Sequence, residues 1–409
     1  MKKLLLLGGS TQQVIAIETA KKLGYFTILC DYLEDNPGQH VADKFYLKST
    51  TDKEEILRIA SEEKIDGILA YASDPAAPTA AYVSNKLNLP GNPYDSVNIL
   101  CNKDLFRDFL KEHDFFSPVS KGYSNLDVAL CDLESDYFTF PVIIKPVDSS
   151  GSKGVTQCNN ALEAKVALTQ AMRYSKNGRI IIEEFVDKKG YQIAGDGLSI
   201  NGELVFRCFA NDHFDHNCSN PFVPISASFP SVLPEHIQGK IHSEIQRLIS
   251  LLNMNNCTYN FDIRVDKDDN VYLMEVAPRN GGNYIPQIIK YATGIDLVEY
   301  AIKIAMGEDI CAVQMRKAEG FWSYYAVHAL QDGILDSVLI KEDVAENNVV
   351  ENHIFKQKNE PIRAFTGANC TLGCLIMKFR TMEEMIDMME NSSKWIEVRM
   401  NDQGGFVNE

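Results

Sequence analysis

Residues 140–155 read FPVIIKPVDSSGSKGV, and this stretch decides the interpretation of the whole chain. An apolar run ends at Lys145, and a loop of small residues follows, made up of Ser149, Ser150, Gly151, Ser152, Lys153 and Gly154. Glycines let backbone N–H groups approach an anion closely, and serines add hydroxyl donors. A lysine before such a loop supplies a point charge for a phosphate. The pattern predicts a phosphate-binding loop, although a flexible surface turn has a similar composition.

A second apolar run lies downstream, where residues 179–186 read RIIIEEFV. We expect a buried strand that ends in the glutamates Glu183 and Glu184, followed by Phe185 and Val186.

A third stretch predicts a β-hairpin, with arms at residues 259–265 and 271–276 and an acidic turn between them. If the turn is centred between Asp268 and Asp269, Asp262 and Glu275 face each other directly. Directly opposed like charges destabilise a sheet, so this pair favours a cation between its members. Mg²⁺ with phosphate oxygens fits that requirement. Two solvated acids are the alternative, but Glu275 lies in the apolar run VYLMEV.

The order and spacing of these motifs resemble those of the ATP-grasp superfamily over most of residues 1–310. Four signals carry the resemblance: Asn102-Lys103 at the start of a helix, Lys145 before the glycine-rich loop, the run Glu183-Glu184-Phe185-Val186, and Asp262 with Glu275-Val-Ala-Pro-Arg279. Residues 8–13 and 31–43 resemble the domain that precedes the grasp fold in carboxylate–amine ligases. The nearest likeness is to the branch with formate-using purine enzymes, biotin carboxylase and L-amino-acid ligases.

The resemblance implies a fold that combines α/β and α+β parts. Strand–helix alternation in the first hundred residues also favours a parallel sheet there. We expect a pre-ATP-grasp α/β domain over residues 1–101, a two-lobed ATP-grasp domain over residues 102–310 and a small α+β domain over residues 311–409. A lid within the central domain is expected at about residues 119–186. A capping box formed by Thr381 and Glu384 predicts a helix in the last domain.

The resemblance also implies roles for the matching residues. Nucleotide binding falls to Lys103, Lys145, Ser149, Ser150, Gly151, Ser152, Gly154, Glu183, Glu184, Phe185 and Val186. Asp262 and Glu275 are expected to hold Mg²⁺, or Mn²⁺ in its place, beside the ATP phosphates. Arg279 is expected to be catalytic, because it can stabilise the transferring phosphoryl group. Substrate binding falls to Asn280, Gly281, Gly282 and Asn283.

Two positions depart from the family pattern. Many relatives have a metal-binding asparagine where this chain has Ala277, so Asn280 or a water is expected to complete the coordination. The resemblance implies that backbone groups of Glu184 and Val186 bind adenine, and relatives often place a glutamate for the ribose shortly after this run. This chain has Lys189-Gly190-Tyr191-Gln192 there, and the ribose contact is expected from Gln192 or Asp196.

Composition narrows the class of partner. The formal net charge of −16 argues against nucleic acid, because phosphate backbones are bound by clustered Lys and Arg. No apolar run approaches the roughly 20 residues needed to cross a bilayer. We therefore expect a cytoplasmic protein that meets neither nucleic acid nor membrane and acts on small molecules, and a homodimer is compatible with the resemblance. The ten cysteines show no regular framework and are expected to be thiols.

Two other motifs suggest different ligands. His213, Asp215, His216 and Cys218 lie close together and could bind zinc, but their spacing matches no standard site and the surrounding residues predict a long polar loop. Gly8, Ser10 and Gln13 stand where an NAD-binding fingerprint requires three glycines, so that interpretation fails.

The sequence thus predicts an ADP-forming ligase that activates a carboxylate as an acyl phosphate and couples it to an amine. The alternatives are a formate- or bicarbonate-activating enzyme of the same superfamily and a non-catalytic ATP-binding module. The metal carboxylates and both lysines are present, which argues against the last alternative.

Overall fold

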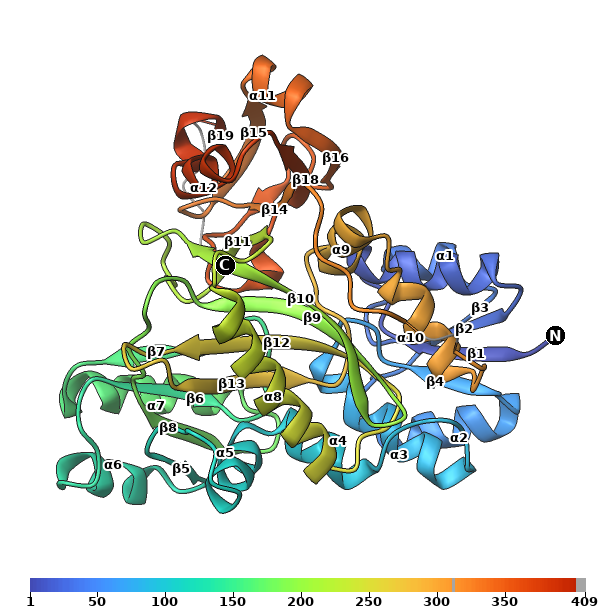
Figure 1. Cartoon of the computed structure of the whole chain (residues 1–409), viewed down its shortest axis with the longest axis horizontal. Coiled ribbons are helices and arrows are strands. Elements are labelled where there is room, and N and C mark those ends of the chain that lie inside the picture. The colour runs from blue at the N-terminus through green and yellow to red at the C-terminus, as the bar shows by residue number, and fades with distance from the viewer. Residues whose placement is uncertain (311–312, 402–409) are drawn as a thin grey trace.

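The computed structural model describes residues 1–310 and 313–401, which form four sheets and the helices around them (Figure 1). These ranges contain no helix long and apolar enough to cross a membrane. The mixture of one parallel and several antiparallel sheets confirms the expected fold class.

The N-terminal sheet is parallel, with strand order β3-β2-β1-β4. Its strands are β1 (Lys3–Leu7), β2 (Phe26–Asp31), β3 (Lys44–Leu47) and β4 (Gly67–Leu69). Leu4 to Leu7 are all buried because helices cover both faces of the sheet, which explains the unbroken apolar run. The helical segments of this region are η1 (Thr11–Gln13), α1 (Val14–Lys22), η2 (Pro37–His40), α2 (Lys53–Glu63), η3 (Asp74–Ala76), α3 (Ala77–Leu87) and α4 (Tyr94–Cys101).

The next region forms a four-stranded antiparallel sheet in the order β5-β8-β6-β7. Its strands are β5 (Ser120–Tyr123), β6 (Val142–Pro146), β7 (Thr156–Cys158) and β8 (Ile180–Glu184). Helix α5 (Lys103–Glu112) leads into this sheet, and α6 (Leu126–Glu134) and α7 (Ala161–Tyr174) pack on one of its faces. The two apolar runs of the sequence, β6 and β8, lie side by side at its centre.

The largest sheet has eight strands in the order β13-β12-β9-β10-β11-β14-β18-β16. Its first part contains β9 (Ile193–Ile200), β10 (Glu203–Phe214), β11 (Pro224–Phe229), β12 (Cys257–Val265) and β13 (Val271–Ala277). Ile193, Phe209 and Phe261 share a core with helix α8 (Glu235–Leu251). Leu198 and Phe206 share the other core with α9 (Ile285–Thr293), and α10 (Leu297–Ala305) returns to the N-terminal domain.

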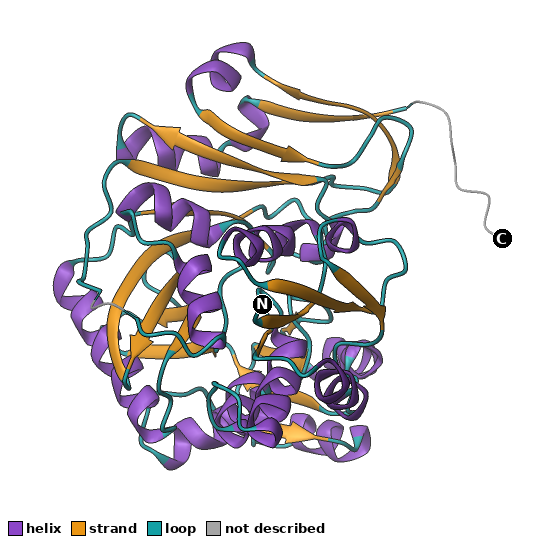
Figure 2. Cartoon of the chain, turned by 90° about the vertical axis from the view of Figure 1, so that its right-hand side faces the viewer, coloured by secondary structure: helices purple, strands orange, loops and turns teal. Residues whose placement is uncertain are grey.

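Three of the C-terminal strands continue this sheet. Strand β14 (Phe321–Val327) pairs with β11, and β18 (Gly373–Phe379) and β16 (Val349–Ile354) follow. A small second sheet contains β15 (Gly333–Ile340), β17 (Pro361–Ile362) and β19 (Ile396–Met400). The remaining segments are α11 (Glu342–Asn347), η4 (Ala368–Cys370), α12 (Met382–Glu390) and η5 (Ser392–Lys394). Figure 2 shows these strands at the top of the molecule, with helices beside them.

Candidate active site

A cavity lies between the four-stranded sheet and the β12–β13 end of the large sheet. Its lining contains most of the predicted nucleotide and metal residues, namely Lys103, Lys145, Ser149, Ser150, Gly151, Ser152, Glu183, Glu184, Val186, Asp262 and Glu275. Lys153, Gln192 and Arg264 also line it. Segments up to about 170 residues apart in the chain therefore meet at one cavity.

The two predicted metal carboxylates face each other across the β12–β13 hairpin, because Asp262 pairs with Glu275. The hairpin forms this pair as expected, but its register near the turn differs from the predicted one. Near the turn Val265 pairs with Val271 and Ile263 with Leu273, a register that would place Met274 opposite Asp262. A β-bulge between Asp262 and Ile263 shifts the pairing by one residue. Bulges re-aim side chains, and this one turns Glu275 toward Asp262.

The carboxylate of Asp262 fits a cation ligand. Its Oδ1 atom is buried and accepts no hydrogen bond from any described residue. Burial, opposed by Arg264 and reinforced by Glu275, raises the pKa of Asp262 to about 6. Buried acceptors are nearly always satisfied, and carboxylate oxygens are the ligands that Mg²⁺ prefers. Asp262 and Glu275 are thus the residues that would hold the ion.

A buried ion network fixes the lysine that precedes the phosphate loop. The Nζ atom of Lys145 lies 2.6 Å from Oε2 of Glu183, and the other carboxylate oxygen lies 2.9 Å from Nε of Arg107. Glu183 is 1% exposed, and its carboxylate positions Lys145. Burial raises the pKa of Glu183, but Arg107 and Lys145 outweigh it and leave the pKa lowered. Burial lowers the pKa of Lys145 despite the attraction of Glu183.

Arg107 also supports strand β13, which carries the predicted metal ligand Glu275. The sequence interpretation missed this arginine. Its guanidinium donates to the carbonyl oxygens of Leu273 and Met274, at 3.2 and 2.9 Å, beside the bulge. One side chain therefore connects the Lys145–Glu183 pair with the backbone that aims Glu275. A signal existed, because Arg107 lies four residues after Lys103 and shares its helix face.

Lys103, the first residue of α5, reaches both halves of the site. Its Nζ donates to the carbonyl oxygen of Ser149 at 2.8 Å and lies 3.4 Å from Oε2 of Glu275. Burial opposes its charge, but Glu275 and Asp74 outweigh burial and raise the pKa of Lys103. The ammonium thus stays charged between the loop and the metal carboxylates.

The predicted phosphate loop has the left-handed backbone that its glycines favour. Gly151, Ser152 and Gly154 have φ of +65°, +57° and +73°. Its Ser152 hydroxyl donates to the carbonyl oxygen of Phe222 at 2.8 Å, and the Ala368 N–H donates to that of Gly151 at 3.2 Å. The loop therefore packs against two later segments of the chain, which its own sequence does not indicate.

The run expected to bind adenine leaves β8 beside the cavity. The N–H of Glu184 donates to Val119, and the carbonyl oxygen of Val186 accepts from Arg264 at 2.9 Å. The Glu184 N–H and the Val186 carbonyl oxygen therefore already have hydrogen-bond partners within the protein. Phe185 does not line the cavity and instead packs under the Arg264 guanidinium, 4.9 Å from its ring centroid.

Arg279 is held by Asp74, another residue that the sequence interpretation missed. Two guanidinium nitrogens donate to the two carboxylate oxygens, at 2.7 and 2.6 Å, and a third donates to the carbonyl oxygen of Asn280. This bidentate pair joins the N-terminal domain to the end of β13. Asp74 follows β4 at the carboxyl edge of the parallel sheet, where functional residues are expected.

The predicted substrate segment divides into buried and bridging residues. Asn280 is 1% exposed, accepts from the Thr258 hydroxyl and donates to the carbonyl oxygen of Leu297. Its side chain is thus hydrogen-bonded within the protein, and its predicted contacts with substrate and metal stay predictions. The Gly281 N–H donates to Asp196, and Asn283 exchanges hydrogen bonds with Gln12 at 2.6 and 3.1 Å. Gly282 lies between them, with Gln12 as its near neighbour.

Of the two residues expected near the ribose, only Gln192 lines the cavity. It donates to Asp212 and accepts from Arg264 at 3.0 Å. Asp196 is fully buried and accepts from Asn260 and Gly281. Burial raises the pKa of Asp196 to about 7 despite these donors.

The segment expected to be a long polar loop is partly a buried strand. Asn211, Asp212 and His213 belong to β10 and are buried. His213 bonds to the Ser228 hydroxyl at 2.8 Å, and burial lowers its pKa to about 4. Only the residues from Asp215 onward form a loop. The four residues predicted to bind zinc therefore do not assemble, since the His213 ring bonds to Ser228 and His216 is exposed.

Comparison with known proteins identifies the central fold. Residues 138–287 match the model of the ATP-grasp domain family. The L-amino acid ligase from Bacillus licheniformis superposes with a TM-score of 0.81 at 21% identity, over 98% of this chain and 99% of that one. The phosphoribosylglycinamide synthetase from Anaerococcus prevotii gives 0.74 at 23% identity, over 98% and 100%.

Relatives by sequence match over shorter ranges. The carbamoyl phosphate synthase large chain from Clostridium botulinum is 25% identical over 308 residues, which are 73% of this chain and 27% of that protein. The formate-dependent phosphoribosylglycinamide formyltransferase from Prochlorococcus marinus is 29% identical over 189 residues, 46% of this chain and 48% of that protein. The chain thus spans about a quarter of the length of the first relative and about half of the second. It contains an ATP-grasp domain, as the sequence motifs predicted.

Proposed function

We propose that this chain, which carries an ATP-grasp domain, is an ATP-dependent ligase that activates a carboxylate as an acyl phosphate and joins it to an amine. The observation that carries the proposal is a single cavity in which Asp262 and Glu275 face each other beside Lys103 and Lys145. Such carboxylates and cations suit the charge of a transferring phosphoryl group. The relatives with ligase and synthetase names support the same chemistry.

In this proposal each group has a defined task. Lys103 and Lys145 bind the phosphates, and residues 149–154 close over them and exclude water. Asp262 and Glu275 would hold Mg²⁺, which would supply positive charge for the phosphate oxygens. The other backbone groups of Glu184 and Val186 meet adenine, and Gln192 lies nearest the ribose. Arg279, oriented by Asp74, binds the carboxylate that accepts the phosphoryl group.

The bonds then change in two steps. A carboxylate oxygen of the substrate attacks the γ-phosphorus, and the bond to ADP breaks. The amine nitrogen attacks the acyl carbon, phosphate leaves, and the amine proton passes to solvent. The carboxylate and the amine are small molecules that meet near Arg279, Gly281 and Asn283.

Hydroxylamine trapping tests the reaction. The purified chain is incubated with ATP, Mg²⁺, hydroxylamine and a library of carboxylic and amino acids. We expect a hydroxamate together with one ADP per product, because an acyl phosphate reacts with that nucleophile. AMP and pyrophosphate would indicate adenylation, turnover with formate or bicarbonate alone would favour one-carbon activation, and no turnover with any acid would favour a binding module. Each of these outcomes would contradict the proposal.

Lys145→Ala should weaken ATP binding about 10- to 150-fold, since a charge-assisted contact contributes about 1.5–3 kcal/mol. Adenosine binding should change little, because adenosine has no phosphate. Calorimetric titration with both ligands measures the difference. Lys121→Ala is the matched control, because Lys121 lies on β5 and pairs with Asp132 outside the cavity. Equal losses for ATP and adenosine would place Lys145 away from the phosphates.

A further inference from the structure

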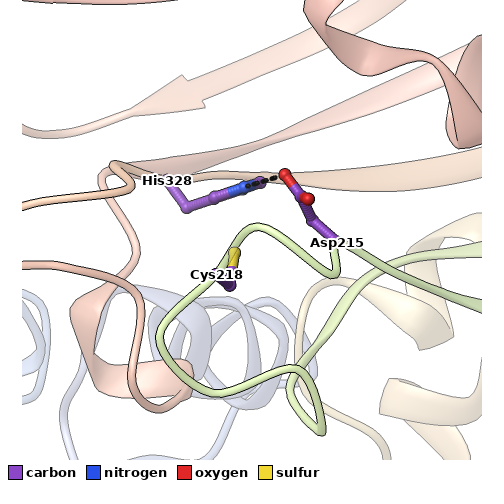
Figure 3. A group of neighbouring side chains, drawn as sticks. All are labelled: Asp215, Cys218 and His328. Atoms are coloured by element: carbon purple, nitrogen blue, oxygen red, sulfur yellow. Dashed lines mark ion pairs between the residues drawn. The ribbon is translucent and has the colours of Figure 1, made fainter.

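A second cluster of ligating side chains lies outside the ATP cavity, at the junction of the two parts of the large sheet. Asp215 and Cys218 come from the loop that follows β10, and His328 directly follows β14 (Figure 3). Their ligating atoms all lie within 4.8 Å of one another. Asp215 and Cys218 were zinc candidates in the sequence, but His328 is more than one hundred residues away in the chain and gave no signal.

The hydrogen bonds of His328 leave one ring nitrogen aimed at the cluster. Its Nδ1 atom lies 2.8 Å from the carbonyl oxygen of Ala326, which can only accept, so Nδ1 carries the proton. The Nε2 atom lies 3.6 Å from Oδ2 of Asp215. That separation is too long for a hydrogen bond. An imidazole oriented through Nδ1 by a carbonyl oxygen, with Nε2 directed at other ligands, is the arrangement found for metal-binding histidines.

The spacing fits a tetrahedral zinc ion. Zinc bonds of about 2.0–2.3 Å hold neighbouring ligand atoms roughly 3.3–3.6 Å apart. The nitrogen and oxygen of this cluster already have that spacing at 3.6 Å, and the sulfur, which lies within 4.8 Å of both, requires a contraction of about 1.5 Å at most. His328 and Cys218 are buried, whereas the Asp215 side chain is 19% exposed. Solvent can therefore reach the cluster and supply a fourth ligand.

We propose that Asp215, Cys218 and His328 bind one Zn²⁺ ion, with water as the fourth ligand. Binding forms a zinc–thiolate bond, and the thiol proton passes to solvent. The ion would fasten the loop of residues 215–222 to the β14 end of the sheet. This proposal is independent of the ligase function.

The position of the loop gives this ion a structural consequence. The Asn220 side chain donates to the carbonyl oxygens of Ser152 and Thr366, at 2.9 and 3.1 Å. Ser152 in turn donates to the carbonyl oxygen of Phe222. Residues 215–222, which the zinc ion would fix at Asp215 and Cys218, therefore contact the predicted phosphate loop at Ser152.

Metal binding tests the site directly. The chain is stripped with a chelator, titrated with Zn²⁺ and, in parallel, with Co²⁺. We expect one equivalent of Zn²⁺ and a thiolate-to-cobalt charge-transfer band in the near ultraviolet. Cys218→Ser, His328→Gln and Asp215→Asn should each weaken Zn²⁺ binding by about 100-fold or more. Asp215→Asn keeps the test valid if either buried variant fails to fold.

Three controls separate this site from other ligands. His216→Gln removes the exposed histidine of the same loop, Cys370→Ser removes another thiol, and Glu275→Gln alters the ATP cavity. All three should retain Zn²⁺ binding. Hydrogen exchange on adding Zn²⁺ should slow for residues 215–222 and not for the turn at residues 266–270. Absence of stoichiometric binding, binding unchanged by Cys218→Ser and His328→Gln, or unchanged exchange at residues 215–222 would overturn the proposal.

Discussion

Glu275→Gln is expected to lower kcat by about 10³-fold, equivalent to about 4 kcal/mol in the activation barrier. The amide has nearly the same shape as the carboxylate but carries no charge, so it cannot balance a divalent cation. It also weakens the 3.4 Å ion pair with Lys103. The fold should persist, because the Glu275 side chain is 30% exposed and the backbone bonds of β13 are unchanged. Phosphate release at saturating ATP, with a range of Mg²⁺ concentrations, measures the effect.

Glu203→Gln provides the matched control for this substitution. Glu203 begins β10 in the same sheet and is exposed, so its loss of charge should leave kcat within about twofold. If Glu275→Gln retains more than a tenth of the wild-type kcat, Glu275 is not a ligand of the catalytic magnesium. Unfolding midpoints of both variants check that any loss of activity is not a loss of fold.

Arg107→Met should lower the free energy of unfolding by about 3 kcal/mol or more, the cost of breaking a buried ion pair by removing one partner. The arginine is 1% exposed, and its removal leaves Lys145 as the single ion-pair partner of the buried Glu183 among the described residues. The carbonyl oxygens of Leu273 and Met274 lose a donor as well. Urea unfolding measures the change.

Two further variants isolate the charge. Arg107→Met combined with Glu183→Gln should recover none of the lost stability, because it also removes the partner of Lys145 and leaves that ammonium buried without a counter-charge. Arg207→Met is the matched control: Arg207 contacts the uncharged side chains of His242 and Gln238, so its loss should be below about 1 kcal/mol. Equal losses for Arg107→Met and Arg207→Met would mean that the buried ion pair contributes no special stability.

Local sequence was sufficient for the individual elements of the site. A continuous apolar run predicts a strand covered on both faces, and β1, β6 and β8 are such strands. Glycines that require positive φ predict the phosphate loop. The helix predicted at Thr381 is confirmed as α12, and Thr381 caps it by accepting from the Glu384 N–H, but the Glu384 carboxylate accepts from the Arg380 N–H and not from that of Thr381.

The pairing of Asp262 with Glu275 in the β12–β13 hairpin was predicted correctly, but the predicted turn register is not what produces it. The pairing of Asp262 with Glu275 was expected from a turn centred between Asp268 and Asp269. The turn has another register, and the bulge beside Asp262 restores the pair. A bulge depends on what surrounds the strand, here Arg107 at the carbonyl oxygens of Leu273 and Met274, and no local pattern specifies it.

The sequence by itself determined the ATP-grasp motifs, the strands and loops that carry them, and the residue types that suit phosphate and magnesium. Only the tertiary structure decided that Asp74 holds Arg279, that Asn280 is buried, and that His328 joins Asp215 and Cys218. The physical reason is the range of the interactions. Periodicity and turn geometry act over a few residues, whereas ion pairs and ligand clusters depend on which distant segments the packed sheets bring within a few ångströms.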